Sequence, residues 1–140
     1  MIRNKYLVIG CGRLGSSIAS EASAAGENVI IIDDDPASFD RLDDSFSGYQ
    51  ITADATDVSA LEEAYIKTAN EIVIATGNDN VNLFLAHLAF EIYQIPKIFV
   101  RFDDPRYGSL VAGMNIKAIY PFELSLNKIK AMMQQGDKGK

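Results

Sequence analysis

Residues 6–15 read YLVIGCGRLG, a short apolar run followed by glycines spaced as G-x-G-x-x-G. The run Tyr6–Ile9 is rich in β-branched residues and stops at Gly10, a pattern typical of a buried parallel strand. Small and apolar residues then follow at helical spacing from Leu14 to Ala25, and Gly26 closes this segment as a C′ glycine. The stretch therefore predicts a strand, a glycine-rich turn and a helix in direct succession.

The rest of the chain repeats this alternation of short apolar runs and longer amphipathic segments. Further strands are predicted at Val29–Ile32, Tyr49–Thr52, Glu71–Ala75, Lys97–Phe102 and Lys117–Tyr120, and further helices at Pro36–Phe46, Val58–Tyr65, Asn80–Tyr93, from Pro105 to about Gly113, and Phe122–Gln134. Six strands alternating with six helices predict an α/β fold with a doubly wound, six-stranded parallel sheet of the Rossmann type. Residues 1–135 are expected to form one nucleotide-binding domain, and residues 136–140 a polar tail.

Composition excludes several classes of protein. The 140 residues are 48% hydrophobic and 23% charged, which is ordinary globular composition. The net charge of −6 argues against a nucleic-acid-binding protein, because phosphate contacts need cations. A single cysteine cannot form an internal disulfide, and no apolar run approaches the roughly 20 residues of a membrane span. The composition predicts a soluble, cytoplasmic protein.

The glycine motif carries the strongest functional signal, because it leaves a predicted strand and opens a predicted helix. Gly10 permits the tight turn, Gly12 lets phosphates approach the backbone, and Gly15 lets the helix pack on the strand. The N–H groups of the first helical turn then present partial positive charge to a phosphate. Asp33 ends the second strand, where its carboxylate can accept from both ribose hydroxyls and would repel a 2′-phosphate. The motif predicts a dinucleotide or nucleotide site that disfavours NADP.

Candidate site residues also follow the first and third strands. Arg13 lies inside the motif, where its guanidinium can bind an anion; the alternative is a solvated arginine at a loop edge. Asp54-Ala55-Thr56 follows the third strand, on the rim expected to face the adenine. The alternative for this segment is simple helix capping by Asp or Thr.

The later strands contribute a second group of candidates. Thr76-Gly77 ends the fourth strand beside the switch point of the sheet, so backbone contacts to a ligand are expected there. Arg101 follows the fifth strand, with local ion pairing to Asp103 or Asp104 as the alternative. Glu123 lies at the start of the last helix, where capping is the alternative.

Cys11 and His87 are weaker candidates for chemistry. A helix N-terminus lowers a thiol pKa, but no base accompanies Cys11 in the sequence, and a small side chain under a nucleotide is its expected role. Nothing at metal-ligand spacing accompanies His87, which is expected to be a packed or partly exposed helix residue. We therefore predict neither a catalytic set nor a metal site.

Five segments taken together resemble a known family. They are GCGRLGSSIA at 10–19, the acidic strand end at Asp33, ADATD at 53–57, ATGNDNVN at 75–82 and VRFDDP at 100–105. In their order and spacing they look like the potassium-conductance regulator domain (RCK or KTN), the N-terminal domain of TrkA and KtrA proteins. The resemblance covers roughly residues 4–133.

The resemblance implies specific roles for the residues that match it. Gly10, Gly12 and Gly15, with Cys11 and Leu14 between them, would form the phosphate loop, and Asp33 beside Asp34 would hold the ribose. Asp54 and Ala55 would flank the adenosine, while Thr76, Gly77 and Arg101 would line the site. Arg13 matches an arginine that approaches terminal phosphates across a subunit interface, and Glu123 falls near a carboxylate linked to cation binding.

The function implied is a nucleotide-sensing regulatory subunit of a potassium uptake system, without enzymatic activity. Its ligand would be an adenine nucleotide, with NAD(H), ATP, ADP and AMP all left open. It would form at least a homodimer in the cytoplasm and lie peripheral to the inner membrane through a transporter partner. TrkA-type members usually carry a second, C-terminal domain, so a second RCK-type chain is a further possible partner.

Two other functions stay open from the residues alone. A nicotinamide-dependent oxidoreductase would use the same cofactor domain, but the 140 residues leave no room for a substrate domain, and a single histidine removes most general-base schemes. A nucleotide-binding module of an unrelated regulator is the third possibility. Turnover of NADH would separate the oxidoreductase from the other two.

Overall fold

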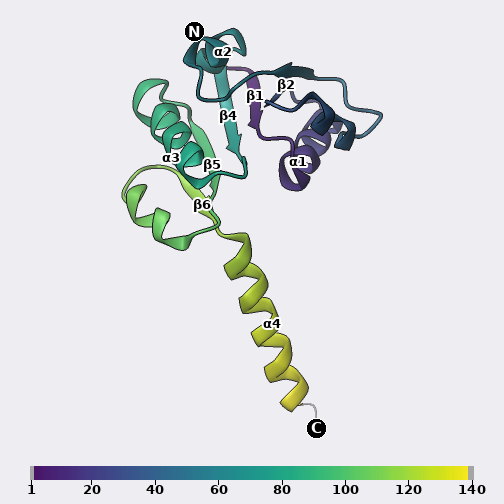
Figure 1. Cartoon of the computed structure of the whole chain (residues 1–140), viewed down its shortest axis with the longest axis vertical. Helices are drawn as coiled ribbons and strands as arrows, with labels where there is room; N and C mark the ends of the chain where they lie inside the picture. Colours follow the sequence, from purple (N-terminus) through teal and green to yellow (C-terminus); the bar gives the residue numbers. More distant parts are fainter. Residues whose placement is uncertain (1, 139–140) are drawn as a thin grey trace.

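A six-stranded, all-parallel sheet forms the centre of the molecule, as the sequence predicts (Figure 1). In the computed structural model, which describes residues 2–138, the strand order is β3-β2-β1-β4-β5-β6. The strands are β1 (Lys5–Ile9), β2 (Val29–Asp33), β3 (Tyr49–Thr52), β4 (Ala69–Ile74), β5 (Lys97–Arg101) and β6 (Lys117–Ile119). This order is that of a doubly wound Rossmann sheet, in which β1 to β3 extend toward one edge and β4 to β6 toward the other.

Alternating side chains of the strands divide the core into two clusters, one on each face of the sheet. Leu7, Ile9, Ile72 and Ile74 pack on one face with α2 (Val58–Glu63) and α3 (Asp79–His87). Val8, Ile31 and Val73 pack on the other face with α1 (Arg13–Ala24) and the 3₁₀ helix η1 (Pro36–Arg41). Strands covered on both faces must be apolar throughout, which explains their continuous hydrophobic runs.

Four predicted helices are shorter or less regular in the structure, among them α2, which ends at Glu63 instead of Tyr65. The segment after Asp35 is a 3₁₀ helix that ends at Arg41 instead of Phe46, and the segment after Asp104 is the 3₁₀ helix η4 (Pro105–Leu110). Asp and Ser side chains compete for backbone hydrogen bonds and so shorten such helices. The predicted helix 80–93 begins at Asp79 as α3 and changes at Leu88 into a π-helical turn, η3 (Leu88–Ile92).

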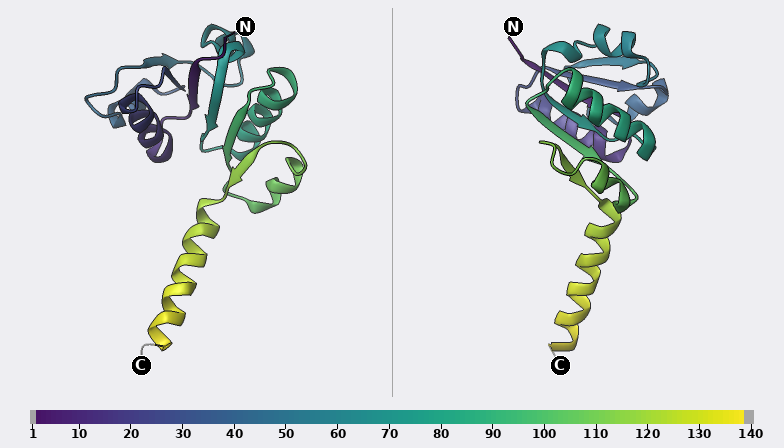
Figure 2. Two further views of the ribbon diagram at one scale, coloured as in Figure 1. Left: turned by 180° about the vertical axis from the view of Figure 1, so that it is seen from behind. Right: turned by 90° about the vertical axis from the view of Figure 1, so that its left-hand side faces the viewer.

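The last helix, α4 (Pro121–Lys138), is longer than predicted and projects away from the domain (Figures 1 and 2). The predicted helix end at Gln134 was wrong, because α4 continues past Gly136 to Lys138; residues 139 and 140 lie outside the described part of the chain. Glycine costs a helix about 1 kcal/mol relative to alanine, which weakens a helix without ending it. Across residues 2–138, the structure contains no helix with the length and apolar character needed to span a membrane.

Candidate functional site

The main candidate site is a cleft of about 550 Å³ at the carboxyl ends of the parallel strands. Its walls come from the ends of β1, β2, β3, β4 and β5, at the point where the strand order reverses. Open parallel sheets bind ligands at this switch point. The lining residues are Ile9, Gly10, Cys11, Gly12, Ile32, Asp33, Asp34, Asp35, Ser38, Arg41, Ala53, Asp54, Ala55, Ala75, Thr76, Gly77, Asn78, Val81 and Arg101.

The glycines of the β1–α1 loop serve different purposes. Gly10 has a φ of +102°, a conformation that side chains rarely adopt, and so makes the tight turn. A Cβ on Gly15 would overlap the carbonyl oxygen of Gly10, so α1 packs this closely only with glycine there. A Cβ on Gly12 would meet nothing within 4 Å. The protein's own packing does not require glycine at Gly12, and Gly12 lines the cleft.

Cys11 lies under the loop and is fully buried. Its thiol donates to the carbonyl oxygen of Ser38 at 3.3 Å. Burial raises the pKa of Cys11, and the nearby Asp33 carboxylate raises it further. The expected lowering by the helix N-terminus was wrong, because desolvation of a thiolate outweighs the dipole at this position.

Asp33 closes the loop from the end of β2. One carboxylate oxygen accepts the Cys11 N–H at 2.7 Å, and the other accepts the Asp35 N–H at 2.8 Å. Each oxygen keeps a further acceptor site, so the carboxylate can still receive ribose hydroxyls. Asp34 beside it is exposed on the cleft wall.

Asp54 and Ala55 line the cleft beyond β3. Asp54 accepts from the N–H and the hydroxyl of Thr56 at 2.9 and 2.7 Å, and these hydrogen bonds hold the pKa of Asp54 below its ordinary value. Helix capping, the alternative reading of this segment, falls instead to Asp57, which accepts the Ser59 N–H at 3.0 Å. The Asp54 carboxylate is therefore fixed, charged and exposed at the rim.

Asn82 joins the ends of β4 and β5. This side chain is 1% exposed although it belongs to α3. Its amide nitrogen donates to the carbonyl oxygens of Thr76 and Arg101 at 3.1 and 2.8 Å. Its amide oxygen accepts the Thr76 N–H at 3.2 Å and contacts the Thr76 hydroxyl. Sequence reasoning missed Asn82, since an asparagine within a helix gives no sign of being buried.

Two arginines line the cleft. Arg41, which sequence reasoning also missed, comes from η1 and donates to the Cys11 carbonyl oxygen at 3.2 Å. Arg101 donates to Asp103 at 3.1 Å, so the ion pair offered as an alternative is present. Its Nε atom is buried and has no partner among the described residues. Both cations lie in a cleft that otherwise carries aspartates.

Four predicted site residues lie outside the cleft walls. Arg13 begins α1 and is exposed, and Gly15 is buried behind the loop. Leu14 lines a different groove, described next, and Glu123 lies in the first turn of α4. Within the described residues no group of His, Cys, Asp and Glu has the arrangement of a metal site.

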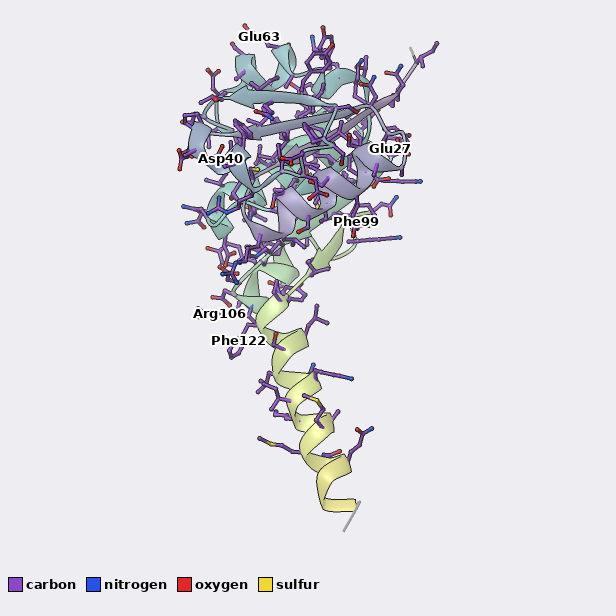
Figure 3. The ribbon with its side chains drawn as sticks, turned by 90° about the vertical axis from the view of Figure 1, so that its right-hand side faces the viewer. Glu27, Asp40, Glu63, Phe99, Arg106 and Phe122 are labelled. Atoms are coloured by element: carbon purple, nitrogen blue, oxygen red, sulfur yellow. The ribbon has the colours of Figure 1, made fainter. Side chains whose placement is uncertain are left out.

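A second, apolar groove of about 530 Å³ runs along the α1 face of the sheet, where α1 and η1 leave β4, β5 and β6 partly uncovered. Leu14, Ile18, Val73, Phe99 and Ile119 form its apolar floor and walls. Glu21, Glu27 and Glu71 add acidic groups to its lining. Figure 3 shows Glu27 and Phe99 on the same side of the domain. Arg101 and Ala75 line both this groove and the main cleft.

Several known proteins are similar to this chain in sequence or in fold. The model of the TrkA-N domain family matches residues 6–121. The Trk system potassium uptake protein TrkA of Streptomyces coelicolor is 34% identical over 113 residues, which cover 81% of this chain and 51% of the relative. The homologue from Methanothermobacter thermautotrophicus is 37% identical over 101 residues, or 71% of this chain and 46% of the relative. The chain thus spans about half the length of these curated relatives.

A solved structure supports the same assignment. The Kef CTD of Shewanella denitrificans in its AMP-bound form superposes with a TM-score of 0.75 at 28% identity, covering 95% of this chain and 82% of that chain. The glycine loop, the strand order and the family match agree with one another. This chain belongs to the TrkA-N domain family.

Proposed function

We propose that the chain is an adenine-nucleotide-binding regulatory module of a potassium uptake system. The observation that carries the proposal is the open space at Gly12, beside the Asp33 carboxylate, at the switch point of a Rossmann sheet. A phosphate over Gly12 would accept hydrogen bonds from the N–H groups at the start of α1. Asp33 would accept hydrogen bonds from the ribose hydroxyls. The AMP-bound relative supports an adenine nucleotide as the ligand, with NAD(H), ATP, ADP and AMP as the candidates.

Thermal unfolding with each candidate nucleotide tests the binding step. A ligand that binds the folded chain at a hundred times its Kd stabilises it by about 2.7 kcal/mol, so the melting temperature should rise. Gly12→Val is the matched variant, because its side chain enters open space and should fill the ligand's place without disturbing the fold. Unchanged melting of the parent chain with every one of these nucleotides would contradict the proposal.

The regulatory role, without catalysis, is proposed on two grounds. The relatives in the family are potassium uptake proteins, and the one histidine, His87, lies on α3 with its Nε2 at 3.0 Å from the Leu110 carbonyl oxygen, not on the cleft wall. A nicotinamide oxidoreductase would need an acid or base beside the cofactor. Incubation with NADH and candidate substrates should show no oxidation, and measurable turnover would favour the oxidoreductase instead.

We further propose that the chain acts in the cytoplasm as at least a homodimer, with α4 of one copy in the apolar groove of the other. Phe122, Leu126, Ile129 and Met133 form an exposed stripe at helical spacing on α4. Lys128 and Lys130 on the same helix complement the glutamates of the groove. Association with a membrane transporter, or with a second RCK-type chain, would build on this pair.

Analytical ultracentrifugation at tens of micromolar tests the association. Ile129→Glu should shift the population toward monomer, because it puts a charge in the apolar contact. Asn127→Glu, on another side of α4, is the control and should leave the dimer intact. A monomeric parent chain in the presence of nucleotide would contradict the dimer. Loss of the gene in its source organism should alter potassium uptake.

A further inference from the structure

Arg101 and Arg41, the two arginines that line the cleft, have different hydrogen-bond partners. Arg41 lies on the β2 side and donates to the loop carbonyl of Cys11. Arg101 lies on the β5 side, where Asp103 is its partner at 3.1 Å, and its buried Nε has no partner among the described residues. A buried donor without an acceptor is costly, and such groups in native proteins call for an explanation.

The backbone that carries Arg101 is held firmly from α3. Asn82 donates to the Arg101 carbonyl oxygen at 2.8 Å. The Asp79 carboxylate accepts the N–H groups of Asp103 and Asp104 at 2.8 and 2.9 Å. The main chain at Arg101 is thus fixed, and Asp103 binds one terminal nitrogen of the guanidinium. A fixed, planar donor of this kind suits bidentate recognition of a phosphate.

The position of Arg101 along the sheet indicates which part of a ligand it could bind. Gly12 follows β1, whereas Arg101 ends β5, and β4 lies between these strands. Neighbouring strands are about 4.8 Å apart, so the two positions differ by roughly 10 Å across the sheet. A phosphate bound at the Gly12 loop therefore lies on the order of 10 Å from the β5 side of the cleft. A ligand with a second phosphate extends toward β5, and one with a single phosphate stops at the loop.

We propose that Arg101 recognises the part of the nucleotide that lies beyond its first phosphate, and so makes the cleft prefer diphosphate-containing ligands such as ADP and NAD⁺ over AMP. This inference rests on the proposed nucleotide binding and deepens it. The second phosphate would take the terminal guanidinium donors that line the cleft and that Asp103 leaves free. Arg13 lies outside the cleft of its own chain, so Arg101 is the arginine that this chain itself places on the β5 side of the cleft.

Titration calorimetry with AMP, ADP and NAD⁺ tests the proposal on the full chain. The parent chain should bind ADP and NAD⁺ at least about tenfold more tightly than AMP, the effect of a charge-assisted hydrogen bond. Arg101→Gln should bring the three affinities within about twofold of one another, with AMP binding unchanged. Arg106→Gln is the matched control, because Arg106 is a surface arginine of the next turn paired with Asp104 at 2.7 Å. It should keep the full preference.

Each outcome has a distinct meaning. An Arg101→Gln protein that keeps the parent's preference overturns the inference, and so does one that loses AMP affinity as much as ADP affinity. If Arg101→Gln fails to fold, Arg101→Lys decides, because it keeps the charge and loses the planar fork. A reduced preference in Arg101→Lys supports the inference, and an unchanged one overturns it. A parent chain that binds none of the nucleotides overturns the proposed function as well.

Discussion

The two halves of the cleft are built in different ways. In the half formed by β1, β2 and β3, the Asp33 carboxylate holds the glycine loop by accepting the Cys11 N–H, and it also accepts the Asp35 N–H. In the half formed by β4 and β5, a single buried amide, Asn82, holds both strand ends. The first half depends on the absence of side chains at its glycines, and the second depends on the hydrogen bonds of one side chain, that of Asn82. The half formed by β1, β2 and β3, here called the loop half, therefore has a glycine pattern that is visible in the sequence. The half formed by β4 and β5 depends on one position within a helix.

The largest expected effect comes from adding one methyl group to the loop half. Gly15→Ala should lower the free energy of unfolding by about 3 kcal/mol or more, because its Cβ overlaps the Gly10 carbonyl oxygen and both elements are packed. Gly12→Ala is the control and should cost less than about 1 kcal/mol, since its Cβ meets open space. Urea unfolding of both variants measures the difference. Equal losses would mean that the loop adapts freely.

Truncating Asn82 should destabilise the half of the cleft formed by β4 and β5. Asn82→Ala should lower the free energy of unfolding by about 2–3 kcal/mol, because it leaves the Thr76 N–H and the Arg101 carbonyl without a buried partner. Asn80→Ala, two residues earlier on α3, removes one exposed hydrogen bond with Tyr107 and should cost less than about 1 kcal/mol. Denaturant titration of both variants compares them. Similar costs for the two would show that Asn82 is not the tie between the strands.

Asp33 tests whether the loop half also binds ligand. Asp33→Ala should weaken adenine-nucleotide binding by about 2 kcal/mol, the range for a hydrogen bond to a charged group. Asp34→Ala, the exposed neighbour on the cleft wall, should change affinity less. Calorimetry on both variants gives the comparison. Unchanged affinity in Asp33→Ala would remove this carboxylate from the binding site.

The smallest effect concerns pH and Cys11. Because burial raises the pKa of the Cys11 thiol in the folded chain, the folded state holds its proton more tightly than the unfolded state does. Its contribution to stability is complete below the ordinary thiol pKa of about 8.5 and is lost as pH rises through the higher folded value. Melting temperatures should fall slightly more steeply above pH 8.5 for the parent than for Cys11→Ala. Parallel curves would contradict this.

The sequence predicts the loop half better than the β4–β5 half for a physical reason. Gly10, Gly15 and Asp33 act within a short stretch of chain, so their spacing alone indicates a strand, a turn and a helix. Asn82 acts through atoms of Thr76 and Arg101, and only the folded sheet brings β4 and β5 to it. Arg41 likewise reaches the loop only in the folded chain, where it is the last residue of η1 and donates to the Cys11 carbonyl oxygen.

Helix predictions fail where local competition decides the outcome. Asp35 caps η1 by accepting the Ala37 N–H at 3.0 Å, as the Asp-Pro pair predicts, but the helix ends at Arg41. The predicted continuation to Phe46 contains Asp43, Asp44 and Ser45, which favour turns over helix. The prediction ended the last helix at Gln134 because Gly136 follows, but a glycine weakens a helix without ending it, and α4 continues to Lys138.

The projection of α4 turns small rotations into large displacements. Its 18 residues extend about 27 Å at 1.5 Å per residue, with Pro121 at the base beside the end of β6. A tilt of about 10° at that base would move the far end by roughly 5 Å over this length. Whatever is attached to the outer turns would therefore move like the tip of a lever whose fulcrum lies next to β5 and Arg101. A change too slight to disturb the sheet could still reposition a distant partner.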